Sequence, residues 1–261
     1  MCSTKILTFW YESVPDYLVL ERARIGPVLS RVSRDPGGRG CDDRRVADTS
    51  GRTYAGQTAD ARRHQRRARL LDAAIDALAG NEWRTLTVDR LCAAAGLNKR
   101  YFYENFASLD EVATAVVDAI AEEVRTATMS AIAAAVTAPL EDQAAAAVLA
   151  LVHTLVDDPR RGRILLGGVA SSPVLHEHRA SVMRGLTAVL VGHARTIHDV
   201  ELEKDALAKV APAFIVGGTA DAILAYLDGR ADISVSDLVA SLTTLWLITG
   251  NGAAEVARTR N

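Results

Sequence analysis

Apolar residues recur every three to four positions along most of the chain after residue 59, which is the spacing of one face of an α-helix. The first such face consists of Leu71, Ala74, Ile75 and Leu78. Gly80 followed by Asn81 is typical of a helix C-terminus, where a residue adopts the left-handed conformation. The pattern therefore predicts a first helix that begins near Asp60 and ends before Gly80.

Two short helices follow in the predicted arrangement. Thr87 is a good N-cap, and the apolar face behind it is made of Val88, Leu91, Cys92 and Ala95. Gly96 ends this helix after about two turns, so we interpret Cys92 as a small buried residue rather than a reactive thiol. Asn98 then caps a third helix, on which Phe102 and Phe106 lie four residues apart on one face.

The rest of the chain is also helical in pattern. Ser108 and Glu111 form a capping box that opens a long helix ending near Pro139. Further helices are predicted over 141–157, 160–170, 174–198, 202–228 and 235–249. Because no segment alternates apolar and polar residues as a strand does, the predicted fold class is all-α.

Residues 1–58 differ from this pattern and form a predicted N-terminal extension. Prolines, paired glycines and mixed charges without a period indicate that residues 33–58 are disordered or loosely attached. Residues 17–30 could form a short docking helix. An alternative is that translation starts further downstream, in which case the N-terminal extension is rarely synthesised.

Charge is unevenly spread along the 261 residues, although the net charge is only −2. Residues 61–106 hold nine Lys and Arg against five Asp and Glu, whereas residues 113–261 hold twelve against seventeen. A small basic unit is therefore joined to a larger acidic one, and the basic unit suits a polyanion. Its two short helices, joined by a glycine turn, match the helix-turn-helix pattern of DNA-binding proteins.

The sequence from Arg69 to Val112 resembles the DNA-binding domain of the tetracycline-repressor (TetR) family of bacterial transcriptional regulators. The residues that carry the resemblance are Leu86-Thr87-Val88, Leu91, Ala95-Gly96-Leu97, Tyr103, Phe106 and the helix start at Ser108. It implies a three-helix DNA-binding domain over 59–110 and a larger helical domain for ligand binding and dimerisation over 111–261. In such proteins a small-molecule ligand releases a repressor from a palindromic operator.

The resemblance also assigns roles to single residues. Leu97, Phe102 and Phe106 would be core, while Thr87 and Tyr103 would meet phosphates. The predicted contacts to bases and flanking backbone come from Asn98, Lys99, Arg100 and Tyr101, with Asn105 on the same outward side. Arg62, Arg63 and Arg66 are expected to contact phosphates and so to give affinity, whereas Arg100 is expected to give specificity. Leu109 stands where the family usually has a lysine, which removes one expected phosphate contact.

The last two helices, within 202–249, would make a homodimer in a protein of this family. Gly217 and Gly218 each weaken a helix by about 1 kcal/mol relative to Ala. Close approach of a second helix would explain them, and a simple kink is the alternative. The small-molecule effector and its pocket residues are not predicted from the sequence.

Several classes of protein are disfavoured. Cys2, Cys41 and Cys92 have no regular spacing, and His176 and His178 do not share a helix face, so we expect neither a disulfide framework nor a metal site. No cofactor or catalytic motif is present, and we expect a non-enzymatic protein. The uncharged run Leu238 to Ala254 is too short and polar for a membrane span, and nothing resembles an export signal, which favours the cytoplasm.

Two alternatives remain open at this stage. The chain could be a small-molecule carrier or enzyme that keeps the helix-turn-helix only as structure. It could also be a protein-binding module whose basic face meets an acidic partner.

Overall fold

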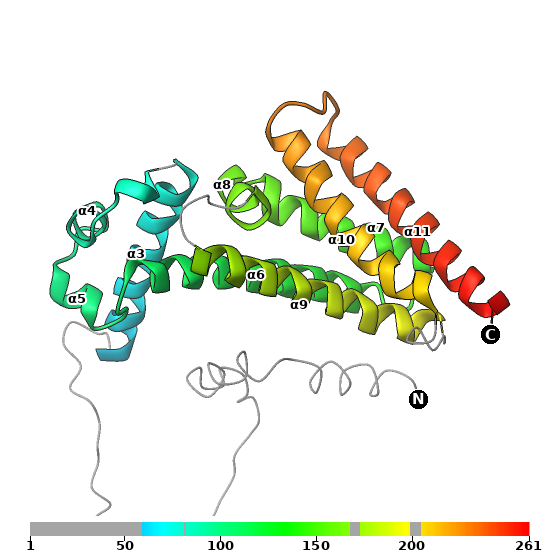
Figure 1. Ribbon diagram of the computed structural model, residues 1–261, viewed down its shortest axis with the longest axis horizontal. Helices are drawn as coiled ribbons and strands as arrows, with labels where there is room; N and C mark the ends of the chain where they lie inside the picture. Colours follow the sequence, from blue (N-terminus) through cyan, green and yellow to red (C-terminus); the bar gives the residue numbers. More distant parts are fainter. Residues whose placement is uncertain (1–58, 81, 168–172, 199–204, 261) are drawn as a thin grey trace, which may run out of the picture. The chain divides into compact units, whose positions relative to one another are not determined.

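The described part of the protein is built from helices. The computed structural model describes residues 59–80, 82–167, 173–198 and 205–260, and every regular element within those ranges is helical (Figure 1). The predicted all-α fold class is confirmed. Residues 59–261 form one compact unit, while the extension predicted over 1–58 lies outside the described residues. The expected boundary between 110 and 111 falls near the start of a continuous helix and remains a prediction.

The first elements are α3 (Ala59–Ala79), η1 (Trp83–Thr85), α4 (Val88–Ala94) and α5 (Lys99–Tyr103). Both predicted N-caps are present. Thr87 Oγ1 accepts a hydrogen bond from Arg90 N at 3.3 Å, and Asn98 Oδ1 accepts one from Tyr101 N at 3.3 Å. Because these caps satisfy amide groups that a short helix leaves free, they fix where α4 and α5 begin.

Gly96 makes the turn between α4 and α5 possible. Its φ is +63°, in the left-handed region that residues with a Cβ rarely adopt. A Cβ at this position would also lie 2.8 Å from Nη2 of Arg69 on α3. The backbone conformation therefore favours glycine, and the flexible end of the Arg69 side chain would have to move to admit a Cβ.

A few large side chains fill the part of the core under these helices. Phe102 is fully buried, and its ring lies 6.1 Å from that of Phe106, centroid to centroid. Leu70, Leu91 and Cys92 belong to the same buried cluster, which continues through the later helices to Leu242. The interpretation of Cys92 as a core residue is confirmed, and burial is the main cause of its raised thiol pKa.

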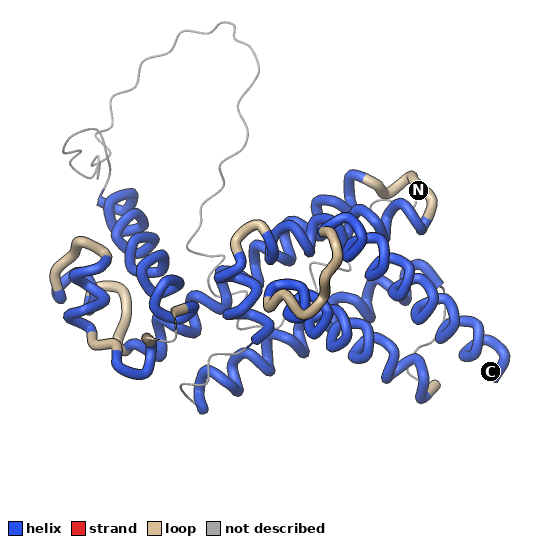
Figure 2. The backbone as a smooth tube through the Cα atoms, turned by 90° about the horizontal axis from the view of Figure 1, so that it is seen from above, coloured by secondary structure: helices blue, strands red, loops and turns tan. Residues whose placement is uncertain are grey.

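The long helix α6 (Leu109–Ala134) follows α5 and contributes residues to the same buried core. Ser108 Oγ accepts from Glu111 N at 3.2 Å, as a capping box requires, while Glu111 Oε2 accepts from Ala107 N at 2.6 Å. Leu109 packs against the buried core, which explains an apolar residue at this position. Further along, α6 packs against α7 (Leu140–Val156) and α9 (Pro173–His198). The tube in Figure 2 follows the same helices from above.

The prediction of one continuous α-helix over 160–170 is wrong. The chain makes a short helix, α8 (Pro159–Gly162), and then a π-helical turn, η2 (Arg163–Gly167); residues 168–170 lie outside the described ranges. Packing against the end of α10 accounts for the change. A Cβ at Gly162 would lie 2.5 Å from Leu227 Cδ1, and Arg163 Nη2 donates to Leu227 O at 2.8 Å. Periodicity in the sequence carries no record of such tertiary contacts.

The last two helices are α10 (Ala206–Leu227) and α11 (Val235–Arg260), which lie side by side (Figure 1). The predicted end at residue 249 is wrong, because α11 continues through Gly250 and Gly252. Ala253, Ala254 and Ala257 are buried in the added turns, and Arg260 Nη1 lies 3.4 Å from Asp205 Oδ2 at the start of α10. Burial and this ion pair outweigh the low helix propensity of the glycines. The predicted first residues of α10, 202–204, lie outside the described residues.

Candidate nucleic-acid interface

Helix α5 is a short helix whose position is fixed from one side. Phe102 anchors it in the core and Asn98 caps its first turn. The side chains of Lys99, Arg100 and Tyr103 are exposed, with 83% of the Arg100 side chain accessible. The Tyr103 ring packs edge-on against Phe102 at 5.2 Å between centroids, which leaves its outer part accessible. Two cations and a phenol are thus held on a defined frame.

Both cations on α5 have an acidic partner. Lys99 Nζ lies 2.8 Å from Asp89 Oδ2 on α4, and this hydrogen bond raises the pKa of Lys99. Arg100 Nε donates to Glu104 Oε1 at 3.0 Å. The exposed surface of α5 therefore carries ion pairs rather than bare cations.

Two of the arginines predicted to contact phosphates also contact α5. Arg63 Nη2 donates to the backbone oxygen of Glu104 at 2.8 Å, at the C-terminus of α5. The guanidinium of Arg66 lies over the Tyr101 ring, 4.4 Å from its centroid, and 3.8 Å from Glu104 Oε2. Because these contacts join α3 to α5, both residues help to orient the helix.

The other predicted residues fall into two groups. The Arg62 side chain is half-buried and makes no hydrogen bond or ion pair with any described residue. Thr87 is exposed, but its hydroxyl already caps α4. Asn105 is half-buried, and its Nδ2 donates to Tyr101 O at 2.7 Å, so this amide stabilises the end of α5. Of the ten predicted residues, Asn98, Lys99, Arg100, Tyr101, Tyr103 and Asn105 lie on or beside α5, and Arg63 and Arg66 contact it from α3. The role of all ten in DNA binding stays a prediction.

Sequence reasoning missed the acidic residues of this surface. The four-residue spacing of Arg100 and Glu104 is a known signal for a helical ion pair and could have predicted that contact. The pair of Lys99 with Asp89 depends on the turn at Gly96 and has no signal in the spacing. The guanidinium of Arg67, 5.1 Å from the centroid of the Phe106 ring, was also missed.

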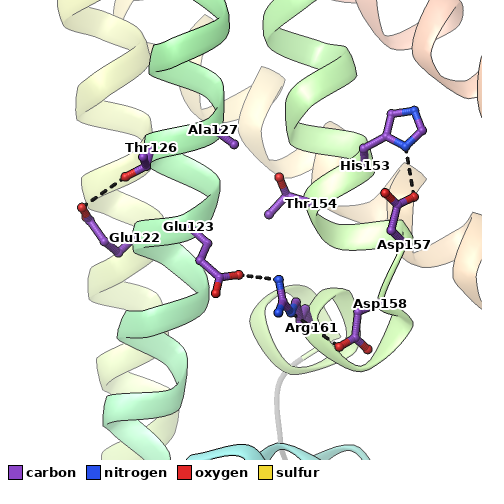
Figure 3. Close-up of a pocket in the computed structure, with 9 residues that line it drawn as sticks. All are labelled: Glu122, Glu123, Thr126, Ala127, His153, Thr154, Asp157, Asp158 and Arg161. Atoms are coloured by element: carbon purple, nitrogen blue, oxygen red, sulfur yellow. Dashed lines mark hydrogen bonds and ion pairs between the residues drawn. The ribbon is translucent and has the colours of Figure 1, made fainter. Parts of the chain in front are cut away.

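A separate recess lies between α6 and α7, where it is closed at one end by α8. It is a largely open hollow with a volume of about 670 Å³. Its lining residues are Glu122, Glu123, Thr126, Ala127, His153, Thr154, Asp157, Asp158 and Arg161 (Figure 3). His153 Nδ1 lies 3.0 Å from Asp157 Oδ1, and Arg161 bonds to Glu123 across the recess. Several charged groups in this wall are therefore already paired.

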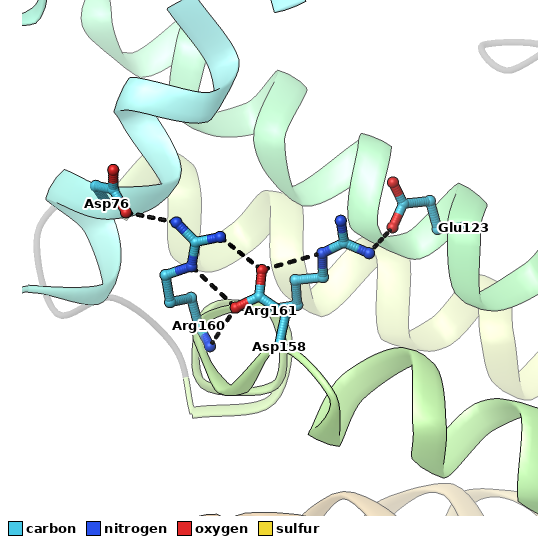
Figure 4. A network of polar contacts seen from close by, with 5 residues as sticks. All are labelled: Asp76, Glu123, Asp158, Arg160 and Arg161. Atoms are coloured by element: carbon cyan, nitrogen blue, oxygen red, sulfur yellow. Dashed lines mark hydrogen bonds and ion pairs between the residues drawn. The ribbon is translucent and has the colours of Figure 1, made fainter. Parts of the chain in front are cut away.

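Polar contacts run from this recess to α3 (Figure 4). Asp158 accepts from Arg160 Nε at 2.9 Å and lies 3.5 Å from Arg161 Nε. Arg160 Nη1 also donates to Asp76 Oδ1 on α3 at 2.5 Å. These contacts join the wall of the recess to the helix that supports α5.

The outer faces of α10 and α11 carry exposed apolar side chains. On α10 these are Leu207, Val210 and Phe214, and on α11 they are Leu245 and Ile248; all but Leu207 are more than half exposed. A Cβ at Gly217 or Gly218 would meet nothing within 4 Å, so no described helix of the same chain explains these glycines. The contact with α11 instead involves Thr219, whose Oγ1 accepts from Trp246 Nε1 at 2.7 Å.

By length and composition alone, one helical stretch in the described part of the chain could cross a membrane. It is Lys209–Leu227, with a mean hydropathy of 1.6 and 22% of the stretch buried. It lies on α10 and is distinct from the uncharged run Leu238 to Ala254 on α11.

Solved structures share this fold. A protein described as a transcriptional regulator from Pseudomonas aeruginosa PAO1 has a TM-score of 0.60 and 21% identity, over 75% of this chain and 95% of that one. The fatty acid degradation regulator FadR from Bacillus halodurans has a TM-score of 0.55 and 17% identity, over 70% of this chain and 94% of FadR. A protein described as a TetR-family transcription regulator from Shewanella sp. PV-4 has a TM-score of 0.55 and 12% identity, over 72% and 97%.

The sequence comparisons found no further relatives. No family model matches the chain, and no curated protein sequence does so. The structural likeness establishes the fold, which is that of transcriptional regulators including a TetR-family protein. The segment from Arg69 to Val112 resembles the DNA-binding domain of the TetR family, and the fold expected from that resemblance is confirmed.

Proposed function

We propose that the protein is a DNA-binding transcriptional regulator that acts as a homodimer, and that it is a repressor released from a palindromic operator by a small molecule. The observation that carries the proposal is α5 itself. A helix of five residues is too short to be stable alone, yet it is capped, anchored by Phe102 and supported by two arginines. Its exposed residues are those that meet phosphates and guanine edges in a major groove.

Selection from a random duplex library with the purified full-length protein tests this function. We expect an enriched imperfect palindrome whose half-sites are about 10 bp apart or a multiple of that, since two symmetric helices must enter the groove on one side of the duplex. Footprinting of the selected sequence should protect both half-sites. A protein that enriched no sequence, and bound no duplex at low salt, would favour the carrier or enzyme alternative.

The homodimer is supported by the exposed apolar faces of α10 and α11. Apolar side chains gathered on two adjacent helices are typical of an interaction surface, and a two-fold axis would place each copy's surface on the other. Gly217 and Gly218 lie exposed on α10 and would let a second helix approach closely. Sedimentation at micromolar concentration should show a dimer, and a helical monomer would contradict a two-fold operator.

The effector site proposed is the recess between α6 and α7. Its Arg161 contacts Asp158, Asp158 accepts a hydrogen bond from Arg160, and Arg160 reaches Asp76 on α3. A ligand that took Arg161 away from Glu123 would alter these contacts. We expect Thr154→Trp, which fills the recess without removing a charge, to block release by the effector while operator binding persists. A variant that still responded fully would move the effector site elsewhere.

A further inference from the structure

We propose that Glu104 and Asp89 set the DNA specificity of this surface, by holding the two cations of α5 in ion pairs that random phosphates must compete against. The inference rests on the DNA-binding function proposed above and adds two residues to it. Neither acidic residue would gain anything from a nearby phosphate backbone, because like charges repel. Their presence beside Lys99 and Arg100 therefore needs a reason.

Glu104 is held in place by three arginines. Arg63 binds its backbone oxygen, while Arg66 and Arg100 lie 3.8 Å and 3.0 Å from its two carboxylate oxygens. The Glu104 side chain has 35% of its surface exposed, against 83% for the Arg100 side chain. Glu104 is thus the fixed member of the pair, and Arg100 is the member that reaches solvent.

The geometry of the pair leaves part of Arg100 free to read a base. Glu104 takes the Nε hydrogen, and the guanidinium keeps its two terminal nitrogens. Those two nitrogens can donate together to O6 and N7 of a guanine. Glu104 would therefore orient Arg100 for one base edge and, at the same time, lower the positive charge that any phosphate would attract.

Asp89 holds Lys99 by a hydrogen bond and by its charge. Lys99 is a flexible point charge whose natural partner on DNA is a phosphate. Its 2.8 Å contact with Asp89 must be exchanged for that phosphate when the protein binds. The exchange weakens contacts with random DNA, where few other interactions favour binding.

The test compares the selected operator with a scrambled duplex, for the full-length protein at several salt concentrations. Glu104→Gln keeps the shape of the side chain and the backbone bond from Arg63. We expect it to bind scrambled DNA about 3-fold more tightly and the operator about 3-fold more weakly, so that the ratio falls about 10-fold. Asp89→Asn should tighten scrambled binding about 3-fold and steepen its salt dependence by about 0.9 in the log–log slope.

Asp72→Asn is the matched control, because Asp72 is exposed on α3 and makes no hydrogen bond or ion pair with any described residue. It removes one negative charge without freeing a cation, and should raise both affinities by the same small factor. A second control places Glu104→Gln in an Arg100→Ala background, where we expect no further loss of operator affinity relative to scrambled DNA. Thermal melting of each variant checks that the fold is kept.

The outcomes separate this inference from the function on which it rests. If wild-type protein discriminates the operator but Glu104→Gln changes both affinities as Asp72→Asn does, the inference is overturned and the function stands. A reduced ratio that persists without Arg100 would also overturn it, since Glu104 would then act by another route. A wild-type protein that failed to discriminate between duplexes would overturn both.

Discussion

The surface around α5 and the outer faces of α10 and α11 expose opposite kinds of side chain. Around α5, charged groups lie outside on a frame held by caps and by Phe102. On α10 and α11, Val210, Phe214 and Ile248 are each more than 60% exposed, and the polar contact between Thr219 and Trp246 lies between the helices. The surface around α5 is charged and well hydrated, whereas the exposed faces of α10 and α11 are apolar.

This difference indicates two kinds of partner for one chain. A charged surface remains soluble without its partner, so it can bind and leave a polyanion as salt and sequence dictate. An exposed apolar surface has a standing cost in water, so it favours a lasting contact such as that between two copies. On the proposed function, α5 would form a reversible interface and the apolar faces of α10 and α11 a lasting one.

The strongest test of the α5 frame is Phe102→Ala. Because Phe102 is fully buried, we expect a loss of about 3–5 kcal/mol in the stability of this region, and loss of binding to operator and random DNA alike. Hydrogen exchange and chemical denaturation would measure it. Tyr103→Ala, at the exposed neighbouring position, is the control and should cost under about 1 kcal/mol. Equal losses of stability for the two variants would show that Phe102 does not anchor α5.

The apolar surface is tested by Phe214→Glu together with Ile248→Glu. Charged carboxylates buried at a contact between copies would be strongly unfavourable, so we expect dimer dissociation to rise by at least about 100-fold, or about 2.7 kcal/mol. Sedimentation should show a folded monomer. Val136→Glu changes an exposed apolar residue in the connection between α6 and α7 and should leave the dimer intact. A dimer that survived the double change would have to form elsewhere.

Arg62 and Arg63 on α3 have different expected roles: Arg62 adds affinity for DNA, and Arg63 also orients α5. Arg62→Ala should weaken operator and random DNA equally and flatten the log–log salt dependence by about 0.9, because it removes one phosphate contact. Arg63→Ala also removes the bond to Glu104 O, so it should lower the preference for the operator as well. Titrations at several salt concentrations distinguish the two. Identical behaviour would mean that Arg63 does not orient α5.

A small pH effect is expected away from both surfaces, at the contact of α9 with α6. His178 Nε2 lies 2.7 Å from Asp118 Oδ1, and this hydrogen bond raises the pKa of His178 despite partial burial. Since the pKa is higher in the folded state, the stabilisation is full below the unfolded value near 6.5 and is lost as pH rises through the folded value. We expect less than about 1 kcal/mol, measured by denaturation from about pH 5.5 to 8.5. His178→Asn should remove this slope; an unchanged slope would assign it to another group.

Local features of the structure were largely determined by the sequence. The caps at Thr87, Asn98 and Ser108 and the burial of Phe102 depend on neighbours within a few residues, and each is where the pattern predicts it. The basic character of residues 61–106 is likewise a property of composition. These features need no knowledge of distant parts of the chain, because capping and amphipathic periodicity act over one or two turns.

Only the tertiary structure decided which of those residues face solvent and where the later helices break. From the sequence, Arg63 and Arg66 are expected to contact phosphates, and the packing of α3 against α5 brings them to Glu104 and Tyr101. Packing against Leu227 converts the middle of the helix predicted over 160–170 into a π-helical turn, and the contact with Asp205 carries α11 past two glycines. Such outcomes depend on partners tens of residues away along the chain, and a periodic pattern contains no information about them.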